Sequence, residues 1–549
     1  MRILLLVSAF NSLSQSVYTY LKDNKHEVVV EFFISEDELN KTIKEFLPDI
    51  IFAPYLKKFI PKEIYEKTPT YILHPGIRGD RGHNALDNAL KENKDEWGVV
   101  ILRANEEFDA GDIYAEVNFK MREDTKASIY RDEVTNSALK ALDKLLENIK
   151  DKSFIPTSQL DAPFHTYLTQ NDRAIDWERD SSKDIIKKIN YSDSYPGVKD
   201  EFFGIECYLF GAHEEERFRG GVKEVLAKRD GAICVGTKDS AIWISHLKEL
   251  GRFKLPATYV LKDKIQGVKE ERLPLLFDMS YKTFYEISVT RDGDVSYLCF
   301  NFHNGAMSSE QCIRLKYAFD FLRENSKVIV LVGAKEFFSN GIHLNILEDS
   351  KKQGEDGWSN INAMNDLLKS IIFADDVVSV ASLHKNAGAG GLFLALACDK
   401  VIARDGVVLN PHYKTLGLSG SEYHTYTMAK RVGQEQMDKL LDDCLPISVQ
   451  NAKSIGLIDE VCGRENYFQD LKEYAKTFLE DEDSYDDFIY EKQDYLDENK
   501  EYINSCKENE LKVMHPQFWD EQSEFHKLRH EFVYKTCPIK TPERFKNHA

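Results

Sequence analysis

Short apolar runs separated by amphipathic stretches dominate the first 150 residues. Residues 3–7 are all apolar, which is typical of a buried strand, and residues 13–24 then carry apolar side chains at helical spacing. This alternation predicts a parallel or mixed sheet with helices on both faces, and ligands bind beyond the carboxyl ends of the strands in such sheets. The further elements predicted here are the strands 27–33, 50–54, 70–74 and 99–104 and the helix 36–46.

The pattern changes twice further along the chain. Between about 165 and 275, short alternating stretches separated by turns predict a small β-rich module, and from 284 to 465 strand–helix alternation returns. The last stretch is helical and highly charged, with a basic end at 535–546. The strands predicted are 205–210, 222–225, 231–234, 241–244, 296–302, 328–332 and 377–383, and the helices are 309–323 and 364–373. The predicted domains are 1–160, 161–280, 281–465 and 466–549.

Composition narrows the possible partners. The chain has 549 residues, of which 72 are Lys or Arg and 92 are Asp or Glu, a formal net charge of −20. Because nucleic acids and anionic membranes are polyanions, this balance argues against both as the main partner. It leaves room for a local basic pocket that binds a phosphorylated small molecule.

Nine cysteines are spread along the chain without a C-x-x-C pair, which argues against a disulfide framework or a zinc ribbon and predicts no metal site. No apolar run reaches the roughly 18 residues of a membrane span. The first apolar run has only five residues, shorter than the about 7–15 of a secretion signal. A cytoplasmic protein is the expectation.

One candidate chemical site follows the predicted strand 70–74. His74 ends this strand, and a glycine-rich basic loop follows it through residue 82. Asp112 closes a D-x-G-D turn that begins at Asp109. A histidine with a carboxylate partner can act as general acid or base, with the carboxylate orienting the ring. His74 and Asp112 are therefore the catalytic candidates, although either motif alone is also typical of structural turns.

Together these motifs resemble the formyltetrahydrofolate-dependent formyl transferases, which carry Asn-x-His, a loop with Pro and Arg, and D-x-G-D. The resemblance covers about residues 1–275. It implies a Rossmann-like domain, a small β-barrel module and 10-formyltetrahydrofolate as formyl donor, with His74 and Asp112 handling protons at the folate nitrogen. The segments that match are 72–74, 109–112, 174–177 and 195–197.

Ile72 departs from this family at the position of its asparagine. In members that formylate amines, the amide helps to hold the tetrahedral oxyanion. An apolar residue there resembles the hydrolase domain of formyltetrahydrofolate dehydrogenase, where a pantetheine thiol accepts the formyl group. A thiolate is a good nucleophile and depends less on that help. The resemblance thus indicates a thiol acceptor, and an amine formyltransferase is the disfavoured variant.

Residues 284–465 resemble the crotonase (enoyl-CoA hydratase/isomerase) superfamily. Crotonases polarise a thioester carbonyl with two backbone N–H groups, one of them in a Gly-rich turn at a helix N-terminus. The resemblance assigns these oxyanion-hole groups to Ile342 and Gly390 and implies an α/β spiral domain with a helical tail. The three motifs that carry it are 304–308, 337–344 and 388–399.

Side chains at the crotonase catalytic positions have changed. The first catalytic glutamate aligns with Phe393, the second aligns near Tyr413, and the loop aspartate is His343. Without those carboxylates a water-adding hydratase is not expected. Glu422 is the carboxylate expected in the pocket, with Tyr413 assisting; the alternatives are an exposed glutamate at a helix start and a core aromatic.

Both halves in this order resemble the HypX/HoxX family of hydrogenase maturation factors. That resemblance implies formyl transfer from 10-formyltetrahydrofolate to coenzyme A, then loss of carbon monoxide from formyl-CoA, which supplies a ligand for Ni-Fe hydrogenase. A hydrogenase subunit or maturation protein is the implied partner. Alternatives are an enzyme that releases formate and a non-catalytic CoA-binding scaffold. The candidate cations for CoA phosphates include Arg131, Lys540 and Arg544.

Overall fold

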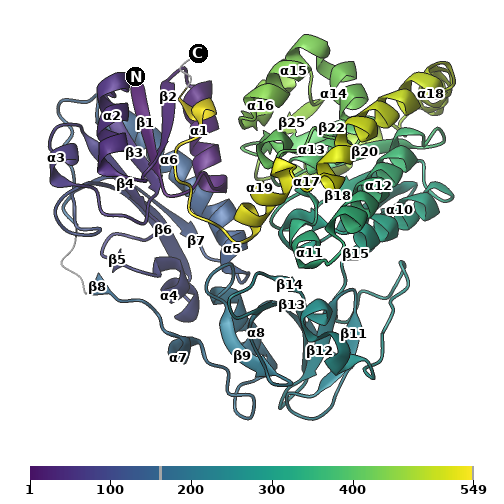
Figure 1. Ribbon diagram of the computed structural model, residues 1–549, viewed down its shortest axis with the longest axis horizontal. Helices are drawn as coiled ribbons and strands as arrows, with labels where there is room; N and C mark the ends of the chain where they lie inside the picture. Colours follow the sequence, from purple (N-terminus) through teal and green to yellow (C-terminus); the bar gives the residue numbers. More distant parts are fainter. Residues whose placement is uncertain (160–163, 547–549) are drawn as a thin grey trace. The chain divides into compact units, whose positions relative to one another are not determined.

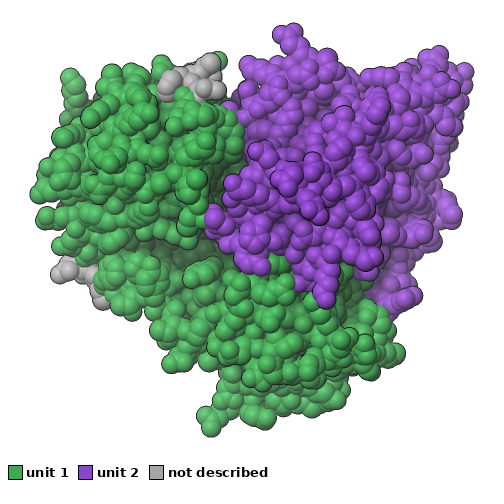
Figure 2. Space-filling model, in the orientation of Figure 1, with its two compact units in different colours: residues 1–271, 281–284, 537–549 green, residues 272–280, 285–536 purple. Residues whose placement is uncertain are grey.

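The computed structural model describes residues 1–159 and 164–546, which fall into two compact units. The first unit comprises residues 1–271, 281–284 and the C-terminal segment from 537, and the second comprises 272–280 and 285–536 (Figure 2). The domain boundary predicted at 160/161 lies outside the described residues.

The N-terminal part of the first unit is built on a six-stranded sheet in the order β2-β1-β3-β4-β6-β7 (Figure 1). The strands β1 to β4 run parallel, and β6 and β7 are antiparallel to their neighbours, so the mixed sheet expected from the sequence is confirmed. Its strands are Arg2–Val7, Glu27–Phe32, Ile50–Tyr55, Thr70–His74, Glu96–Arg103 and Ile113–Lys120 for β1, β2, β3, β4, β6 and β7. Its helices are Ser12–Asp23, Glu36–Phe46, Lys62–Tyr65, Ala85–Lys91, Lys126–Ile129 and Thr135–Asn148 for α1 to α6.

A second sheet in this unit is antiparallel, in the order β11-β12-β13-β10-β9, with β14 paired to β13. It confirms the predicted β-rich module. The strand predicted at 222–225 starts only at Val225, because Lys223 has φ 62° in a left-handed turn that an extended strand excludes. The strands β9 to β14 are Val198–Phe202, Ile205–Glu215, Val225–Arg229, Ala232–Gly236, Ala241–Glu249 and Leu255–Pro256, and the helices α7 to α9 are Gln170–Arg173, Ser182–Tyr191 and Ala257–Leu261.

The second unit has a six-stranded sheet in the order β15-β16-β18-β20-β22-β25, parallel except at its first pair. Two short sheets, β17-β19 and β21-β23-β24, join the loops that follow its strands. The strands β15 to β25 are Ile287–Asp292, Val295–Phe300, Ala306–Met307, Val328–Val332, Gly341–Ile342, Val378–Leu383, Ala387–Gly388, Lys400–Arg404, Val408–Asn410, Ile447–Ser448 and Glu460–Cys462. The helices α10 to α19 are Ser309–Arg323, Leu344–Asp349, Gln353–Ile372, Gly390–Leu396, His424–Val432, Gln434–Asp443, Val449–Ser454, Tyr467–Thr477, Glu482–Trp519 and Glu524–Val533.

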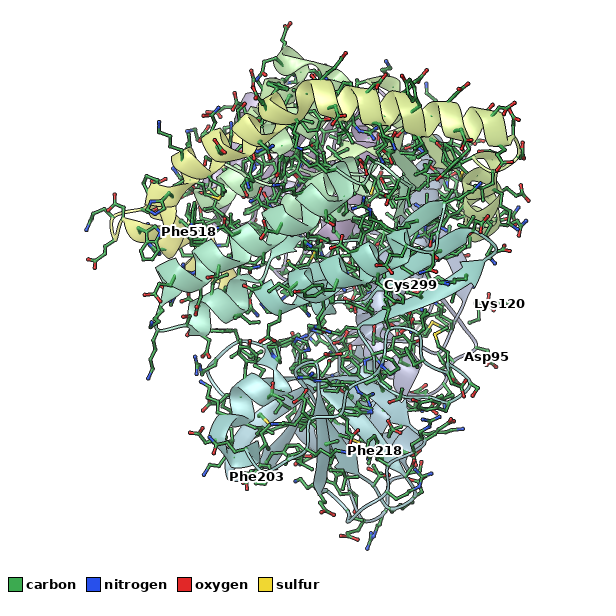
Figure 3. The ribbon with its side chains drawn as sticks, turned by 90° about the vertical axis from the view of Figure 1, so that its right-hand side faces the viewer. Asp95, Lys120, Phe203, Phe218, Cys299 and Phe518 are labelled. Atoms are coloured by element: carbon green, nitrogen blue, oxygen red, sulfur yellow. The ribbon has the colours of Figure 1, made fainter. Side chains whose placement is uncertain are left out.

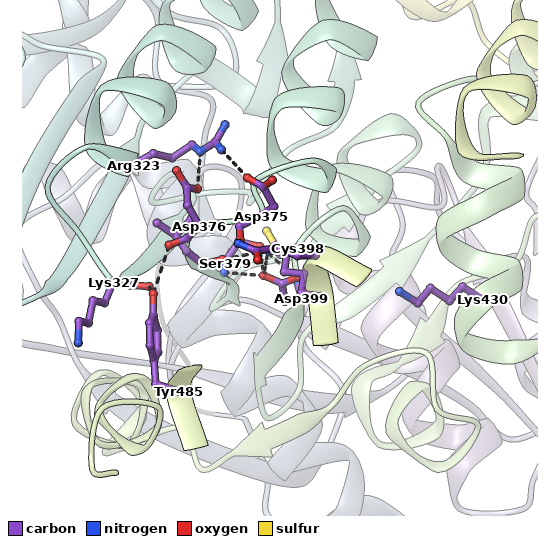
Figure 4. Close-up of polar contacts among 12 residues, drawn as sticks. Arg323, Lys327, Asp375, Asp376, Ser379, Cys398, Asp399, Lys430 and Tyr485 are labelled. Carbon is purple, nitrogen blue, oxygen red and sulfur yellow. Dashed lines mark hydrogen bonds and ion pairs between the residues drawn. The ribbon is translucent and has the colours of Figure 1, made fainter. Parts of the chain in front are cut away.

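The 38-residue helix α18 is fixed to the second unit at both ends. Near its start, Lys492 Nζ pairs with Asp399 Oδ2 at 2.7 Å. The Tyr485 hydroxyl lies within hydrogen-bond distance of the backbone carbonyls of Lys327 and Asp376 (Figure 4). Near its end, Phe518 is buried against Gly357 of α12 and the ring of Phe525 (Figure 3). These contacts at both ends fix the position of the middle of α18 relative to the rest of the second unit.

The C-terminal segment belongs to the first unit, not to the second as predicted. Thr541 Oγ1 donates to the buried carboxylate of Glu31 at 2.7 Å and accepts from the N–H of Phe32. Phe545 packs its ring 4.7 Å from that of Phe10. The packing of Phe545 and the hydrogen bond of Thr541 to Glu31 on β2 thus hold this basic segment in the first unit, although the residues before it in the sequence belong to the second. None of the helices in 1–159 and 164–546 combines the length and apolar character needed to cross a bilayer.

Candidate active sites

His74 lies at the carboxyl end of β4, in the middle of the first sheet, with 4% of its surface exposed. Its Nε2 is 2.7 Å from Asp80 Oδ2, and its Nδ1 is 3.4 Å from Asp109 Oδ2. Burial lowers the pKa of His74, but the charge of Asp109 and the hydrogen bond and charge of Asp80 outweigh it, so the pKa is raised overall. This arrangement favours an imidazolium that can donate a proton.

The first aspartate of D-x-G-D, not the second, meets His74. Asp109 adopts φ 51° and accepts a hydrogen bond from the N–H of Gly82, whereas Asp112 is exposed at the start of β7. The expected pairing of His74 with Asp112 is therefore wrong in the structure. Gly111 explains the difference, since a β-carbon there would collide with the carbonyl of Arg103 and the turn must pack tightly.

Gln159 ties the two aspartate-bearing loops together and was not predicted. Its Oε1 accepts from the N–H of Gly79 at 2.8 Å, and its Nε2 donates to the carbonyl oxygens of Asp80 and Asp109. Asp80 lies in the glycine-rich loop that follows His74, but the sequence did not indicate it as a catalytic candidate. The carboxylate that best holds His74 thus comes from within the loop that follows it.

Gly76 leaves the space that the His74–Asp80 contact needs. A β-carbon at this position would collide with His74 Nε2 and lie 2.5 Å from Asp80 Oδ2.

Gly76→Ala is therefore expected to separate this pair and to lower formyl transfer by about a hundredfold, as an ångström-scale misplacement does. Steady-state rates of formyl transfer measure the effect. Gly267→Ala is the matched control, because a β-carbon there meets nothing within 4 Å. A wild-type rate in Gly76→Ala would contradict the assignment.

Ile72 is half-buried on β4, two residues before His74 and therefore on the same face of the strand. It pairs with Ala53 of β3 and Leu102 of β6. Where formyl transferases that act on amines carry an amide, this position carries the aliphatic side chain of Ile72. The site accordingly has no side-chain amide at that position to hold an oxyanion.

Two of the three predicted CoA-binding cations lie around the N-terminus of α1. Arg544 stacks on Phe545, which packs against Phe10. Arg131 follows Tyr130, whose hydroxyl accepts from the side chain of Asn11, the N-cap of α1. Lys540 is exposed on the segment that leads to Thr541. The chain neighbours of Arg131 and Arg544 thus contact the residues that begin α1, and anions are stabilised at a helix N-terminus.

In the second unit, the two predicted oxyanion-hole segments meet. A β-carbon on Gly341 would lie 3.0 Å from the backbone nitrogen of Gly390, the first residue of α13. Ile342 follows directly on β19. Asn360 of α12 fixes these loops, because its Oδ1 accepts from the N–H of His343 and its Nδ2 donates to the carbonyl of Met307.

The carboxyl of Glu422 lies beside Gly390 and is buried, not on an exposed helix start. It is 5% exposed, and a β-carbon on Gly390 would lie 2.5 Å from its Oε1. Burial raises the pKa of Glu422 to about 7, while hydrogen bonds from Ser421 to its Oε2 act in the opposite direction. Glu422 itself has φ 63°, an unusual left-handed backbone that aims the carboxyl inward.

Aromatic rings close the site around Glu422. The ring of Tyr413 is 5.8 Å from that of Phe393 and 5.5 Å from that of His424. The Tyr413 hydroxyl is buried and has no hydrogen-bond partner among the described residues. Burial, followed by the charge of Glu422, raises the pKa of Tyr413, so it carries its proton at neutral pH. His343 serves instead as a cap, since its Nδ1 accepts from the N–H of Ile346.

Comparison with known proteins places both sites in a family. Residues 34–145 match the formyl transferase family, 167–264 the formyl transferase C-terminal domain and 300–502 the enoyl-CoA hydratase/isomerase family. Hydrogenase maturation factor HoxX from Bradyrhizobium diazoefficiens is 36% identical, with all of this chain and 97% of that protein aligned. The chain belongs to the HypX/HoxX family of hydrogenase maturation factors.

A solved member of this family has the same fold. HypX from Aquifex aeolicus, in complex with tetrahydrofolic acid, superposes with a TM-score of 0.97 at 42% identity over 100% of this chain and 98% of that one. Methionyl-tRNA formyltransferase from a Sulfurihydrogenibium strain is 27% identical over 45% of this chain and 80% of its own length. The resemblance and the fold class expected from the sequence are thus confirmed.

Proposed function

We propose that this HypX/HoxX family member moves a formyl group from 10-formyltetrahydrofolate to coenzyme A and then releases carbon monoxide from formyl-CoA. The observation that carries the proposal is Glu422, a single buried carboxyl beside Gly390 in a crotonase-type oxyanion corner from which the family's two glutamates are missing. The tetrahydrofolic acid bound to Aquifex aeolicus HypX supports folate as the donor.

In the first step, the thiolate of CoA attacks the formyl carbon and the bond from carbon to the folate nitrogen breaks. That nitrogen leaves as an amine and needs a proton. His74, held as an imidazolium between Asp80 and Asp109, is placed to donate it. The apolar side chain of Ile72 suits a thiol acceptor, because a thiolate attacks without a side-chain amide to hold the oxyanion.

The CoA phosphates need cations in spite of the acidic chain. Arg131 and Arg544 lie around the N-terminus of α1, and its first turn has no acidic residue. Guanidinium groups and a helix N-terminus together make an anion site. We therefore assign Arg131 and Arg544 to the phosphates, with Lys540 as an outer cation.

In the second step, the formyl C–H bond breaks, its proton goes to Glu422, and the electron pair expels the CoA thiolate as carbon monoxide forms. The thiolate then takes a proton, so that CoA and CO are the balanced products. The N–H groups of Ile342 and Gly390 would stabilise charge on the formyl oxygen. The protonated Tyr413 hydroxyl is a donor for the departing sulfur.

Carbon monoxide made in this way would supply a ligand for the Ni-Fe centre, with a hydrogenase subunit or another maturation protein as the recipient. The name of the Bradyrhizobium diazoefficiens relative supports this place in hydrogenase maturation. Within residues 1–159 and 164–546 no cysteine is in a disulfide, and we infer a reducing, cytoplasmic setting.

One assay tests the whole proposal. Purified protein is incubated with 10-formyltetrahydrofolate and CoA, and CO is trapped on a reduced haem protein while formate is measured in parallel. We expect CO and tetrahydrofolate in equal amounts. Formate without CO would replace the proposal by a formyl-CoA hydrolase. If neither CO nor formate forms, a non-catalytic CoA-binding scaffold is favoured.

A further inference from the structure

A buried histidine–glutamate pair lies directly behind Glu422. His424 begins α14, and Glu510 comes from the middle of α18. His424 Nδ1 is 3.0 Å from the carbonyl oxygen of Ser421 and 3.3 Å from Glu510 Oε1. Both side chains are at least nine-tenths buried. The pair has no part in the two steps derived above.

The surroundings fix which ring nitrogen of His424 carries hydrogen. A carbonyl oxygen and a carboxylate are both acceptors, so Nδ1 must be the donor. A carboxylate behind Nδ1 holds the ring in one orientation and stabilises its positive form, as in histidine–carboxylate pairs of many enzymes. Burial lowers the pKa of His424, but the hydrogen bond and charge of Glu510 outweigh it and raise the pKa overall.

His424 and Glu422 share one short loop. Ser421 donates through its N–H and hydroxyl to Glu422 Oε2, while its carbonyl accepts from His424. The positive charge of His424 lowers the pKa of Glu422, against the larger opposite effect of burial. The other titratable groups that interact with Glu422 are Glu510 on α18, Tyr413 after β23 and Cys312 on α10. Among these groups, His424 is the cation.

We propose that Glu510 holds His424 as a buried imidazolium that positions Glu422 and keeps it in the carboxylate form able to remove the formyl proton. His424 is in this sense a positioning residue. The proposal rests on the proposed function, because it concerns the base of the second step.

A purely structural role explains only part of the geometry. Glu510 Oε1 also accepts from the N–H and hydroxyl of Thr425, and so satisfies one of the N–H groups in the first turn of α14 that have no partner within the helix. A glutamine could accept those two bonds equally well. The negative charge at 510 is needed only if the facing ring is positive.

The test compares pH profiles of CO release from added formyl-CoA for wild type, His424→Asn and Glu510→Gln. With the cation removed, the pKa of Glu422 rises. We expect the acid limb of the profile to move up by about one unit in His424→Asn, which lowers the rate at pH 7 about fivefold. The shift in Glu510→Gln should be smaller, because that variant also removes a negative charge that raises the pKa of Glu422. His530→Asn is the control, because His530 also pairs with a glutamate, Glu348, in the same unit, but its side chain is exposed and is not one of the groups that act on the pKa of Glu422.

A second readout needs no catalysis. In protein carrying 15N-labelled histidine, the signal lost in His424→Asn should report an imidazolium at pH 7 in wild type and a neutral ring in Glu510→Gln. A neutral His424 in wild type, or an acid limb that stays in place in a stable His424→Asn variant, would overturn the proposal. If wild type makes no CO from formyl-CoA, the proposed function fails. The 15N signal still shows whether His424 is protonated beside Glu510.

Discussion

Replacing His74 with alanine is expected to abolish formyl transfer to CoA while added formyl-CoA still yields CO. The imidazolium is the only group in the described site whose two nitrogens both face buried or half-buried carboxylates, at 2.7 and 3.4 Å. Loss of a positioned acid lowers rates by about 10²–10⁴-fold. Tetrahydrofolate release and CO trapping, measured on the same preparation, separate the two steps.

The two aspartates of D-x-G-D provide the matched comparison. Asp109→Asn removes a charge that contacts His74 and should lower formyl transfer strongly, whereas Asp112→Asn alters an exposed residue and should leave the rate close to wild type. Equal losses in both variants, or a greater loss in Asp112→Asn, would contradict the geometry.

The two carboxylates that contact His74 predict a pH dependence of formyl transfer. Because Asp109 and Asp80 raise the pKa of His74 above its ordinary 6.5, the proton-donating form persists above that pH and is lost as the pH rises through the raised pKa. Asp80→Asn removes one of these charges, so the alkaline limb of formyl transfer should move to lower pH.

The sequence predicted the folds well where apolar periodicity and backbone motifs carry the information. The strand that ends at His74 and the turn that begins α13 at Gly390 lie where they were expected. Both features are local, since a buried strand and a glycine turn are specified by their own residues.

Contacts between segments far apart in the sequence could not be predicted from it. Two aspartates three residues apart fit one motif, and the left-handed backbone of Asp109 together with the close packing of Gly111 decides which of them faces His74. Glu510 lies 86 positions after His424, and Thr541 lies 510 positions after Glu31. Helix periodicity indicates which face of α18 is buried, but it does not indicate which histidine that face meets.

The departures from the formyl transferase and crotonase patterns nevertheless identified the chemistry that the geometry supports. Ile72 replaces an amide on the same strand face as His74, and Phe393 and Tyr413 replace glutamates around one remaining carboxyl. An apolar surrounding suits the proposed release of CO, because addition of water to formyl-CoA would give formate instead. Phe393 and Tyr413 thus remove the two hydratase glutamates and, as aromatic rings, also help to bury Glu422.

Glu422→Gln is expected to retain formyl-CoA formation and to lose CO release by about 10²–10⁴-fold, since the amide cannot accept the formyl proton. In wild type the carboxylate forms as the pH rises through about 7, so CO release should increase over that range. The variant should be at least as stable as wild type above pH 7, because burial disfavours the charge that the amide removes. Lost activity therefore cannot be attributed to unfolding, which thermal denaturation checks. Unchanged CO yield with accumulating CoA would reject Glu422 as the base and leave Tyr413, which interacts with Glu422, as the next candidate.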